Sequence, residues 1–340
     1  ETFKMNVYTT RRTACRPQEA YDVINSRATQ IDLNGFGFTG GFSYTPFPIP
    51  KNGLEAIWNH VPRYLGGGVE RQFNAFPVRA SGDYYKIGTE ERRVFFRNLD
   101  QPKDNLLGVF MSRFLAPATL EGTVFLVHEP IDQVKETRSA WIYNSGQRRV
   151  RRAPDLSYDN VNDGTEGLRT TDQFDAFNGA PDRYDWKLVG KKEIYVPYNA
   201  YKLSDKKLKY KEDIIRKFTP NADLMRYELH RVWEVEANLK PGSRHIYAKR
   251  VFYLDEDSWT VLYEDAYDTR KQLWRVSIHP LMQFYDAKVP WFRANIWHDL
   301  NNGSYLLSNL DNEIKAPWKF GDKAAWNDFQ PDSLRRIGTK

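Results

Sequence analysis

The chain has 340 residues, of which 15% are aromatic and 28% are charged, and it contains a single cysteine, Cys15. One cysteine excludes a disulfide within the chain, and no apolar run reaches the roughly 18 residues that a membrane-spanning helix requires. The 50 Lys and Arg exceed the 44 Asp and Glu, but the two signs are interspersed and no nucleic-acid motif accompanies them, which argues against a nucleic-acid partner.

The first 70 residues predict an irregular arm followed by one amphipathic helix. Residues 1–52 are rich in Gly, Pro and Asn and show little periodicity. From residue 53 to 65 apolar side chains recur at helical spacing, and Gly66 follows as a helix end. The apolar residues of this stripe are Leu54, Ile57, Trp58, Val61 and Leu65. We expect the helix to lie across a sheet as a plug or lid.

Residues 71–152 predict a series of antiparallel strands, because apolar and polar residues alternate between clusters of turn formers. The expected strands and hairpins, with hairpin turns in brackets, are 71–80, 83–97 (88–91), 106–115, 123–128 and 139–152 (144–146). On the last hairpin, Trp141 and Tyr143 share one face.

The middle of the chain predicts a long strand between two short helices. Residues 183–196 alternate as a strand does, and Pro197 closes the run, which is typical of a strand end or an edge. The short helices are expected near residues 172–177 and 212–217.

Residues 226–275 predict a meander of four antiparallel strands with one strongly aromatic face. Pro241 and Gly242 mark the first turn, and residues 255–258 mark the second. The aromatic residues expected on the apolar face are Tyr227, Trp233, Trp259 and Tyr263.

Two charged residues interrupt that aromatic face. Arg231 shares a face with Tyr227 and Trp233, and Asp265 shares one with Tyr263. An unpaired charge on a buried face is costly, so each needs a partner. Two interpretations stay open: a cross-strand ion pair inside the core, or an Arg231 that faces a cavity and binds an acidic headgroup.

The end of the chain completes a single domain. Residues 276–285, 291–297 and 304–310 are expected to continue the sheet, and a short helix is expected near residues 331–337. The predicted fold is mainly β (α+β), with a large curved antiparallel sheet forming a half-barrel around a few helices. Its parts are 1–70 (arm and lid helix), 71–310 (half-barrel) and 311–340 (tail).

Signals for catalysis, metals or cofactors are sparse. The run GFGFTG at residues 35–40 fits a dinucleotide pattern but opens no helix, and neither H-E-x-x-H nor G-x-S-x-G occurs. The acids at 255–257 are expected to point outward as turn formers. His230 and Glu228 share a strand face as ordinary surface neighbours or, as the least favoured hypothesis, as the acid–base pair of a hydrolase. We therefore predict no catalytic residue, no metal and no cofactor.

Long motifs spread over the chain resemble one known family. They are PFPIP (46–50), NGLEAIWNH (52–60), WIY with RRVRRAP (141–154), KEIYVPYNAY (192–201), RYELHRVW (226–233), FYLDEDSW (252–259) and LWR (273–275). The chain in this respect resembles the bacterial secreted proteins called domain of unknown function 1329. That family looks related to the periplasmic lipoprotein carrier and its outer-membrane receptor, whose half-barrel encloses helices and a hydrophobic cavity.

The resemblance implies a periplasmic protein, with association with the outer membrane as a further expectation. Residue 1 is Glu and not Met, which fits a chain whose signal peptide has been removed or omitted. The leading hypothesis is a non-catalytic carrier or chaperone for a lipid or other hydrophobic molecule. Its expected ligand-binding residues are Trp58, Trp141, Tyr143, Tyr227, Arg231, Trp233, Trp259, Tyr263 and Asp265. The alternative is a structural protein of the outer membrane that assists envelope transport proteins.

Overall fold

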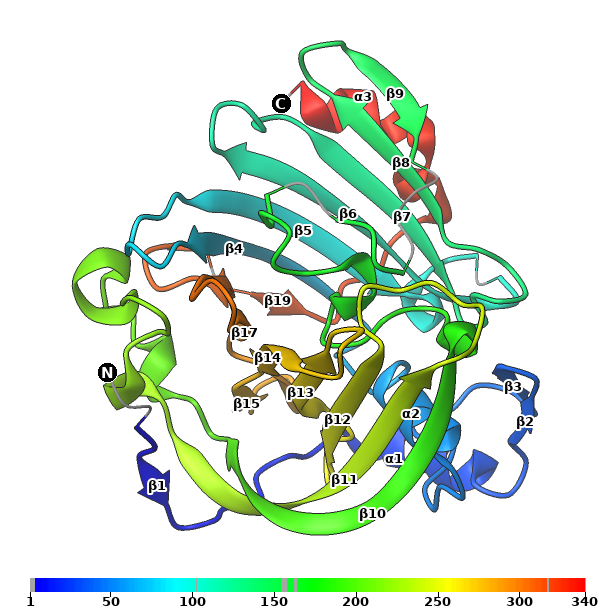
Figure 1. Cartoon of the computed structure of the whole chain (residues 1–340). Coiled ribbons are helices and arrows are strands. Elements are labelled where there is room, and N and C mark those ends of the chain that lie inside the picture. The colour runs from blue at the N-terminus through cyan, green and yellow to red at the C-terminus, as the bar shows by residue number, and fades with distance from the viewer. Residues whose placement is uncertain (1–3, 102, 154–157, 162–163, 317, 340) are drawn as a thin grey trace.

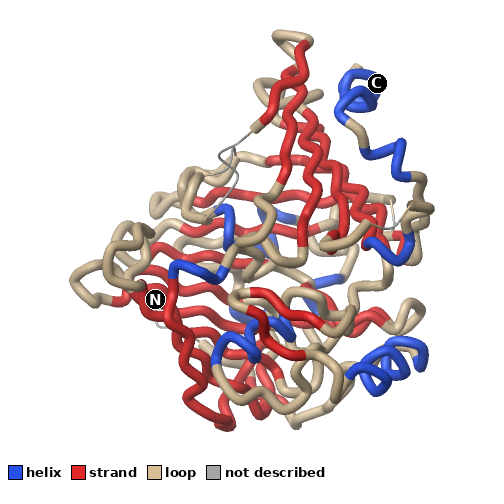
Figure 2. The backbone as a smooth tube through the Cα atoms, turned by 90° about the vertical axis from the view of Figure 1, so that its right-hand side faces the viewer, coloured by secondary structure: helices blue, strands red, loops and turns tan. Residues whose placement is uncertain are grey.

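Strands are the main regular structure of the protein in the computed structural model, which describes residues 4–101, 103–153, 158–161, 164–316 and 318–339. In the side view the helices are short segments beside a wide array of strands (Figure 2). The helices are α1 (Gln18–Arg27), α2 (Gly53–His60) and α3 (Pro331–Gly338). The strands of the first half of the chain are β1 (Val7–Tyr8), β2 (Asp32–Asn34), β3 (Gly37–Thr39), β4 (Gly68–Val78), β5 (Ile87–Phe95), β6 (Leu106–Ala116), β7 (Val124–Pro130), β8 (Ser139–Asn144) and β9 (Arg149–Arg152). Those of the second half are β10 (Tyr184–Pro197), β11 (Tyr227–Leu239), β12 (Lys249–Asp255), β13 (Val261–Tyr267), β14 (Leu273–Ile278), β15 (Leu281–Phe284), β16 (Val289–Phe292), β17 (Asn295–Asp299), β18 (Tyr305–Leu310) and β19 (Lys319–Phe320).

One sheet of 15 strands organises the fold. Its order is β1-β11-β12-β13-β14-β17-β18-β4-β5-β6-β7-β8-β9, with β10 paired to β11 and β19 paired to β4. The pairs are antiparallel except β1 with β11. In the described chain β9 and β10 do not pair with each other, so the sheet stays open. Figure 1 shows β10 and β11 as a long curved ribbon around the lower edge. The predicted half-barrel is confirmed.

The predicted meander is confirmed as β11 to β14, and the turn before β12 has the expected chemistry. Ser243 N donates to Lys240 O at 3.1 Å, and Gly242 has a φ of 82°, a conformation that Gly adopts without strain. The long strand β10 and the tail helix α3 are also confirmed.

The hairpin predicted for residues 83–97 is wrong. β5 runs without interruption through that stretch and pairs with both β4 and β6. The polar residues that suggested a turn, Thr89 and Glu91, are buried on one face of this strand. Polar alternation was misleading here because these side chains face a polar interior and not solvent.

Other boundaries also differ from the prediction. β14 ends at Ile278, and β15 and β16 form a separate two-stranded ribbon after Pro280, which cannot donate to a ladder. The helices expected near 172–177 and 212–217 are a 3₁₀ turn at Thr171–Gln173 and a single π-helical turn at Tyr210–Ile214. Helix α1 was not predicted.

The two faces of the sheet bury different layers. On the first, here called the α2 face, Phe252 and Leu254 pack in one cluster with α2. On the second, the opposite face, Ile296 and Leu307 pack against the segment 201–225. Helix α3 covers β7, β8 and β9 on this opposite face (Figure 1).

Helix α2 is buried against the sheet. Asn52 caps it by accepting a hydrogen bond from Glu55 N at 2.9 Å, and seven of its eight residues are buried. Gly53 approaches β10 so closely that a Cβ there would lie 2.7 Å from Lys187 N. The predicted helix is confirmed, and its tight packing against β10 fits the plug of the two expected roles.

Candidate functional site

Hollows lie on both faces of the sheet. The inner cavity, of about 230 Å³, lies on the α2 face and is walled by β4 to β7, β17, β18 and residues 164–175. The groove, of about 1030 Å³, lies on the opposite face between β10, β12 to β14 and residues 216–223. The inner cavity carries the more specific chemistry, because buried charges and rings alternate along its walls.

Aromatic and aliphatic side chains form most of the inner cavity's surface. They are Phe73, Ala75, Ile87, Phe110, Phe114, Phe125, Val127, Phe174, Trp291, Trp297 and Leu306. Phe110 and Phe174 stack with ring centroids 5.3 Å apart and an interplanar angle of 16°. Such a wall shelters an apolar group from water.

Ion pairs are set among these rings. Arg71 and Glu91 pair at 2.8 Å across β4 and β5, and Arg138 pairs with Glu129 at 2.8 Å. Asp175 is shared by two guanidinium groups, at 2.9 Å from Arg63 and 3.6 Å from Arg93.

The charge of Asp175 is held by those two arginines. Burial alone would raise the pKa of its carboxyl group, but Arg63 and Arg93 outweigh burial and lower the pKa to about 2. With Asp175 ionised at neutral pH, the cavity region holds five arginines, counting Arg169, against the three carboxylates of Glu91, Glu129 and Asp175. The hollow therefore carries a net positive charge.

Among the five arginines of the cavity region, Arg169 forms no ion pair with any residue that the structure describes. Its Cζ lies 5.6 Å from the Phe174 ring centroid and 5.3 Å from that of Trp297. Burial lowers the pKa of Arg169 to about 10, and the distant Glu91 only partly opposes this. A cation between two rings without a carboxylate is suited to an anionic ligand.

Unsatisfied buried polar atoms in the cavity wall point to the same ligand chemistry. Among the described lining residues, Arg71 Nη1, Arg93 Nη1, Arg169 Nε and Trp297 Nε1 are shielded from solvent and have no hydrogen-bond partner. All four are donors, and no lining residue described leaves a buried acceptor unsatisfied. A cavity with spare donors fits a ligand that supplies oxygen acceptors.

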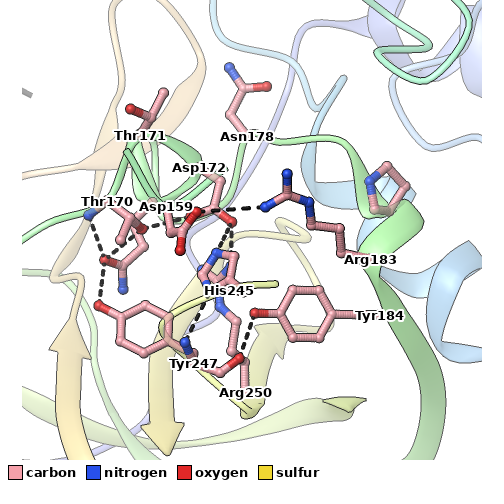
Figure 3. A network of polar contacts seen from close by, with 12 residues as sticks. Asp159, Thr170, Thr171, Asp172, Asn178, Arg183, Tyr184, His245, Tyr247 and Arg250 are labelled. Atoms are coloured by element: carbon pink, nitrogen blue, oxygen red, sulfur yellow. Dashed lines mark hydrogen bonds and ion pairs between the residues drawn. The ribbon is translucent and has the colours of Figure 1, made fainter. Parts of the chain in front are cut away.

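A buried polar network holds the segment that closes the cavity (Figure 3). Asp172 Oδ2 accepts from Arg250 Nη1 at 2.8 Å and from His245 Nε2 at 3.1 Å. Arg250 Nε also donates to Glu264 at 2.5 Å, and Gln173 Nε2 donates to Glu264 at 2.8 Å. The pKa of Asp172 is lowered despite its burial, because Arg250 and His245 stabilise the carboxylate. Phe174 and Asp175 directly follow this anchored turn.

Only two of the nine predicted ligand-binding residues line a hollow. Tyr263 and Asp265 line the groove, where Tyr263 donates to Tyr195 O at 3.0 Å and Tyr253 donates to Asp265 Oδ2 at 3.1 Å. Burial raises the pKa of Asp265. Asp265 and Arg231 do not pair with each other.

The other aromatic residues pack inside the protein. Trp58 lies in the α2 cluster and donates its indole N–H to Phe36 O at 2.9 Å. Trp141 and Tyr143 pack beneath α3, and Tyr227 packs beneath the segment 201–225. Trp233 stacks on Trp259 with centroids 5.9 Å apart. These rings belong to packed clusters outside both hollows.

The prediction that Arg231 lies on a buried face is wrong. Its side chain is 50% exposed and lies 3.6 Å from Glu256. Buried positions of β11 switch from even numbers, such as His230 and Val232, to odd numbers, such as Val235 and Ala237. The reason is that different layers cover the two halves of this long strand, so one register does not define one buried face.

Three acidic or basic groups expected at the surface are buried. Glu228 and His230 are 0% and 5% exposed, and Asp255, expected to point outward from its turn, is 0% exposed. The residues of the inner cavity were not predicted as a site. The available signal was the alternation of Thr89, Glu91 and Arg93 opposite Arg71, which suits two strands that face a polar hollow.

Comparisons with known proteins place this geometry in context. The family model described as "Protein of unknown function (DUF1329)" matches residues 1–335. The uncharacterized protein PA3922 of Pseudomonas aeruginosa is 48% identical over 346 residues, which cover 100% of this chain and 76% of that protein.

Solved structures share the fold at low sequence identity. A domain from Vibrio parahaemolyticus, assigned to outer membrane lipoprotein sorting, is 15% identical, with a TM-score of 0.56 over 81% of this chain and 94% of that one. A DUF1329 protein from Desulfovibrio piger is 14% identical, with a TM-score of 0.54 over 79% and 92%. Within the described residues, none of the helices has the length and apolar character needed to cross a membrane.

Proposed function

The chain belongs to the DUF1329 family of proteins of unknown function, and from this premise we propose that it is a periplasmic carrier of a small amphiphile. The ligand has an apolar body and an anionic head, and it binds in the inner cavity without being chemically changed. The unsatisfied donors of Arg71, Arg93, Arg169 and Trp297 within a wall of aromatic rings carry this proposal.

The apolar part of the binding energy follows from the rings. Sheltering a few hundred Å² of alkyl surface stabilises a complex by several kcal/mol at about 25 cal/mol per Å². The volume of about 230 Å³ lies below the range of about 300–1,000 Å³ typical of ligand pockets. We therefore expect a ligand with one alkyl chain or one small ring system.

The guanidinium groups of the cavity are the reason to expect an anionic head on the ligand. Arg169 has no carboxylate partner among the described residues, so a ligand carboxylate or phosphate adds an interaction without breaking one. Donors that lack partners in the free protein also lower the cost of binding, since fewer internal hydrogen bonds must be exchanged.

The compartment and the absence of chemistry are part of the same proposal. The fold is shared with a domain assigned to outer membrane lipoprotein sorting, and this supports a carrier in the bacterial envelope. Binding by burial and charge accounts for the features of the inner cavity without a nucleophile or a general base.

Isothermal titration calorimetry tests the proposal with two matched probes, a fatty acid and the fatty alcohol of equal chain length. Ser112 on β6 lines the inner cavity, and Ser112→Trp is expected to abolish binding of both probes by filling it. Tyr195→Trp places the same side chain at the groove and serves as the matched control, with both affinities unchanged.

If Tyr195→Trp abolished binding and Ser112→Trp left it unchanged, the binding site would lie in the groove, and this result would contradict the proposal. If neither probe binds the wild-type protein, the inner cavity has no carrier role, and a structural protein of the outer membrane becomes the better interpretation.

A further inference from the structure

A second cluster of functional groups lies at the ends of β11 and β12, outside both hollows. A ring nitrogen of His230 and one carboxylate oxygen each of Asp255 and Asp257 all lie within 4.8 Å of one another. His230 and Asp255 are buried, whereas Asp257 keeps 17% of its side chain exposed. The cluster is thus a nearly enclosed set of three ligating groups with one side open to solvent.

The imidazole of His230 is held in a fixed orientation. Its Nε2 lies 3.0 Å from Glu228 Oε2, and its ring stacks on Tyr198 with centroids 3.9 Å apart. With Nε2–H donated to Glu228, the lone pair of Nδ1 is left for another partner. A carboxylate on one ring nitrogen is the arrangement that commonly orients a metal-binding histidine.

Glu228 is itself kept in place by hydrogen bonds. It accepts hydrogen bonds from Asn199 Nδ2 at 2.9 Å, Arg226 Nε at 2.8 Å and Arg11 N at 2.8 Å. Together with the contact to His230, these hydrogen bonds use both carboxylate oxygens of Glu228, so the orientation of Glu228 relative to the imidazole is fixed.

Asp255 supplies an oxygen that lacks a partner. Its Oδ2 accepts from Ser258 N at 2.9 Å, Ser258 Oγ at 2.7 Å and the Tyr198 hydroxyl at 3.1 Å. Its Oδ1 is buried and has no hydrogen-bond partner among the described residues. Leaving a carboxylate oxygen buried and unsatisfied is costly, and a cation at this position removes the cost.

Asp257 is held by Arg12 of the N-terminal arm. Arg12 Nε donates to Asp257 Oδ2 at 2.8 Å, and Arg12 Nη2 contacts Oδ1. The Arg12 side chain is 62% exposed, so it can move away without uncovering a core. A metal ion at Asp257 would compete with this guanidinium for the carboxylate.

We propose that His230, Asp255 and Asp257 bind a divalent transition-metal ion, that Glu228 orients His230, and that Arg12 competes with the metal for Asp257. One imidazole and two carboxylates suit Zn²⁺, and three protein ligands leave a coordination position for water. This site is independent of the inner cavity and of the carrier proposal.

Isothermal titration of the chelator-treated protein with ZnCl₂ tests the site, and the visible absorption of Co²⁺ in place of Zn²⁺ gives a second readout of coordination. Wild-type protein is expected to bind one ion per chain. Asp257→Asn is expected to weaken binding at least about tenfold, and Glu228→Gln about 10- to 100-fold through the loss of His230 orientation. Arg12→Gln is expected to strengthen binding.

Glu256→Gln is the matched control, because it removes an acid of the same turn that is outside the cluster. The affinity of this variant for Zn²⁺ is expected to stay within about twofold of that of the wild type. Absence of saturable Zn²⁺ binding to the wild type would overturn the proposal, as would equal losses in Asp257→Asn and Glu256→Gln. Asp257 and Arg12 are both partly exposed, so these variants keep the test valid if a buried substitution prevents folding.

Discussion

Arg71 on β4 and Glu91 on β5 lie directly opposite each other in the sheet, and their side chains pair at 2.8 Å in the wall of the inner cavity. Both residues are buried, at 4% and 1% exposure. Glu91 neutralises one guanidinium of the cavity, while Arg169 has no such partner in the described structure. The pair therefore sets both the stability of the wall and the net charge that a ligand meets.

Glu91→Gln is expected to change stability and binding in opposite directions. The substitution leaves Arg71 without its carboxylate and is expected to lower the free energy of unfolding by about 3 kcal/mol. It also makes the hollow more positive, so affinity for the fatty acid is expected to rise about tenfold, or ~1.4 kcal/mol. Urea unfolding measures the change in stability, and isothermal titration calorimetry measures the change in affinity. Glu90→Gln, whose side chain is 41% exposed, is the control.

Arg169→Gln is expected to weaken binding of the fatty acid about tenfold and to leave binding of the fatty alcohol unchanged, because only the acid presents a charge to the guanidinium. The free energy of unfolding is expected to stay equal or to rise, since an unpaired cation is removed from a shielded position. Arg113→Gln, on the same sheet but outside the inner cavity, is the control. Equal losses for acid and alcohol would show that Arg169 does not contact the headgroup.

Asp172→Asn is expected to destabilise the protein by about 3–5 kcal/mol, because it removes one carboxylate from a wholly buried Arg250. Urea unfolding measures the change. Asp223→Asn breaks an ion pair with Lys4 in which both side chains are more than half exposed, and it is expected to leave the free energy of unfolding close to that of the wild type. Similar losses in the two variants would contradict the assigned role of the buried network.

The free energy of unfolding is expected to fall at acid pH, partly because Asp175 becomes protonated. The pKa of the Asp175 carboxyl group is about 2 in the folded protein, below its ordinary value of 3.8. A carboxyl group whose pKa is lowered by folding stabilises the protein above its unfolded pKa, and this contribution is lost as pH falls toward the folded pKa. Asp175→Asn is therefore expected to be less stable at pH 7 by about 2 kcal/mol, with the gap to the wild type closing between about pH 4 and pH 2.

Urea unfolding at a series of pH values measures this gap. A gap that stays constant down to pH 2 would show that Asp175 does not depend on the charges of Arg63 and Arg93. Asp185→Asn removes an exposed acid on β10 and serves as the control for the loss of one negative charge.

The amino-acid sequence by itself determined the family, the open antiparallel sheet and most strand boundaries, because alternation and turn residues act over short distances. The meander from β11 to β14 is an example, since its turns are specified by residues such as Pro241 and Gly242. The same local signals misjudged β5, where Thr89 and Glu91 alternate toward a polar interior.

Only the tertiary structure decided which residues form the sites. Periodicity shows which side chains share a face, but it does not show which layer covers that face, as the switch of buried positions along β11 demonstrates. The cavity joins β5 to residues 164–175, and its closing segment is held by contacts such as Gln173 with Glu264, 91 residues apart. Charges buried by such long-range packing are paired by the fold as a whole, so their partners and their spare donors became visible only in three dimensions.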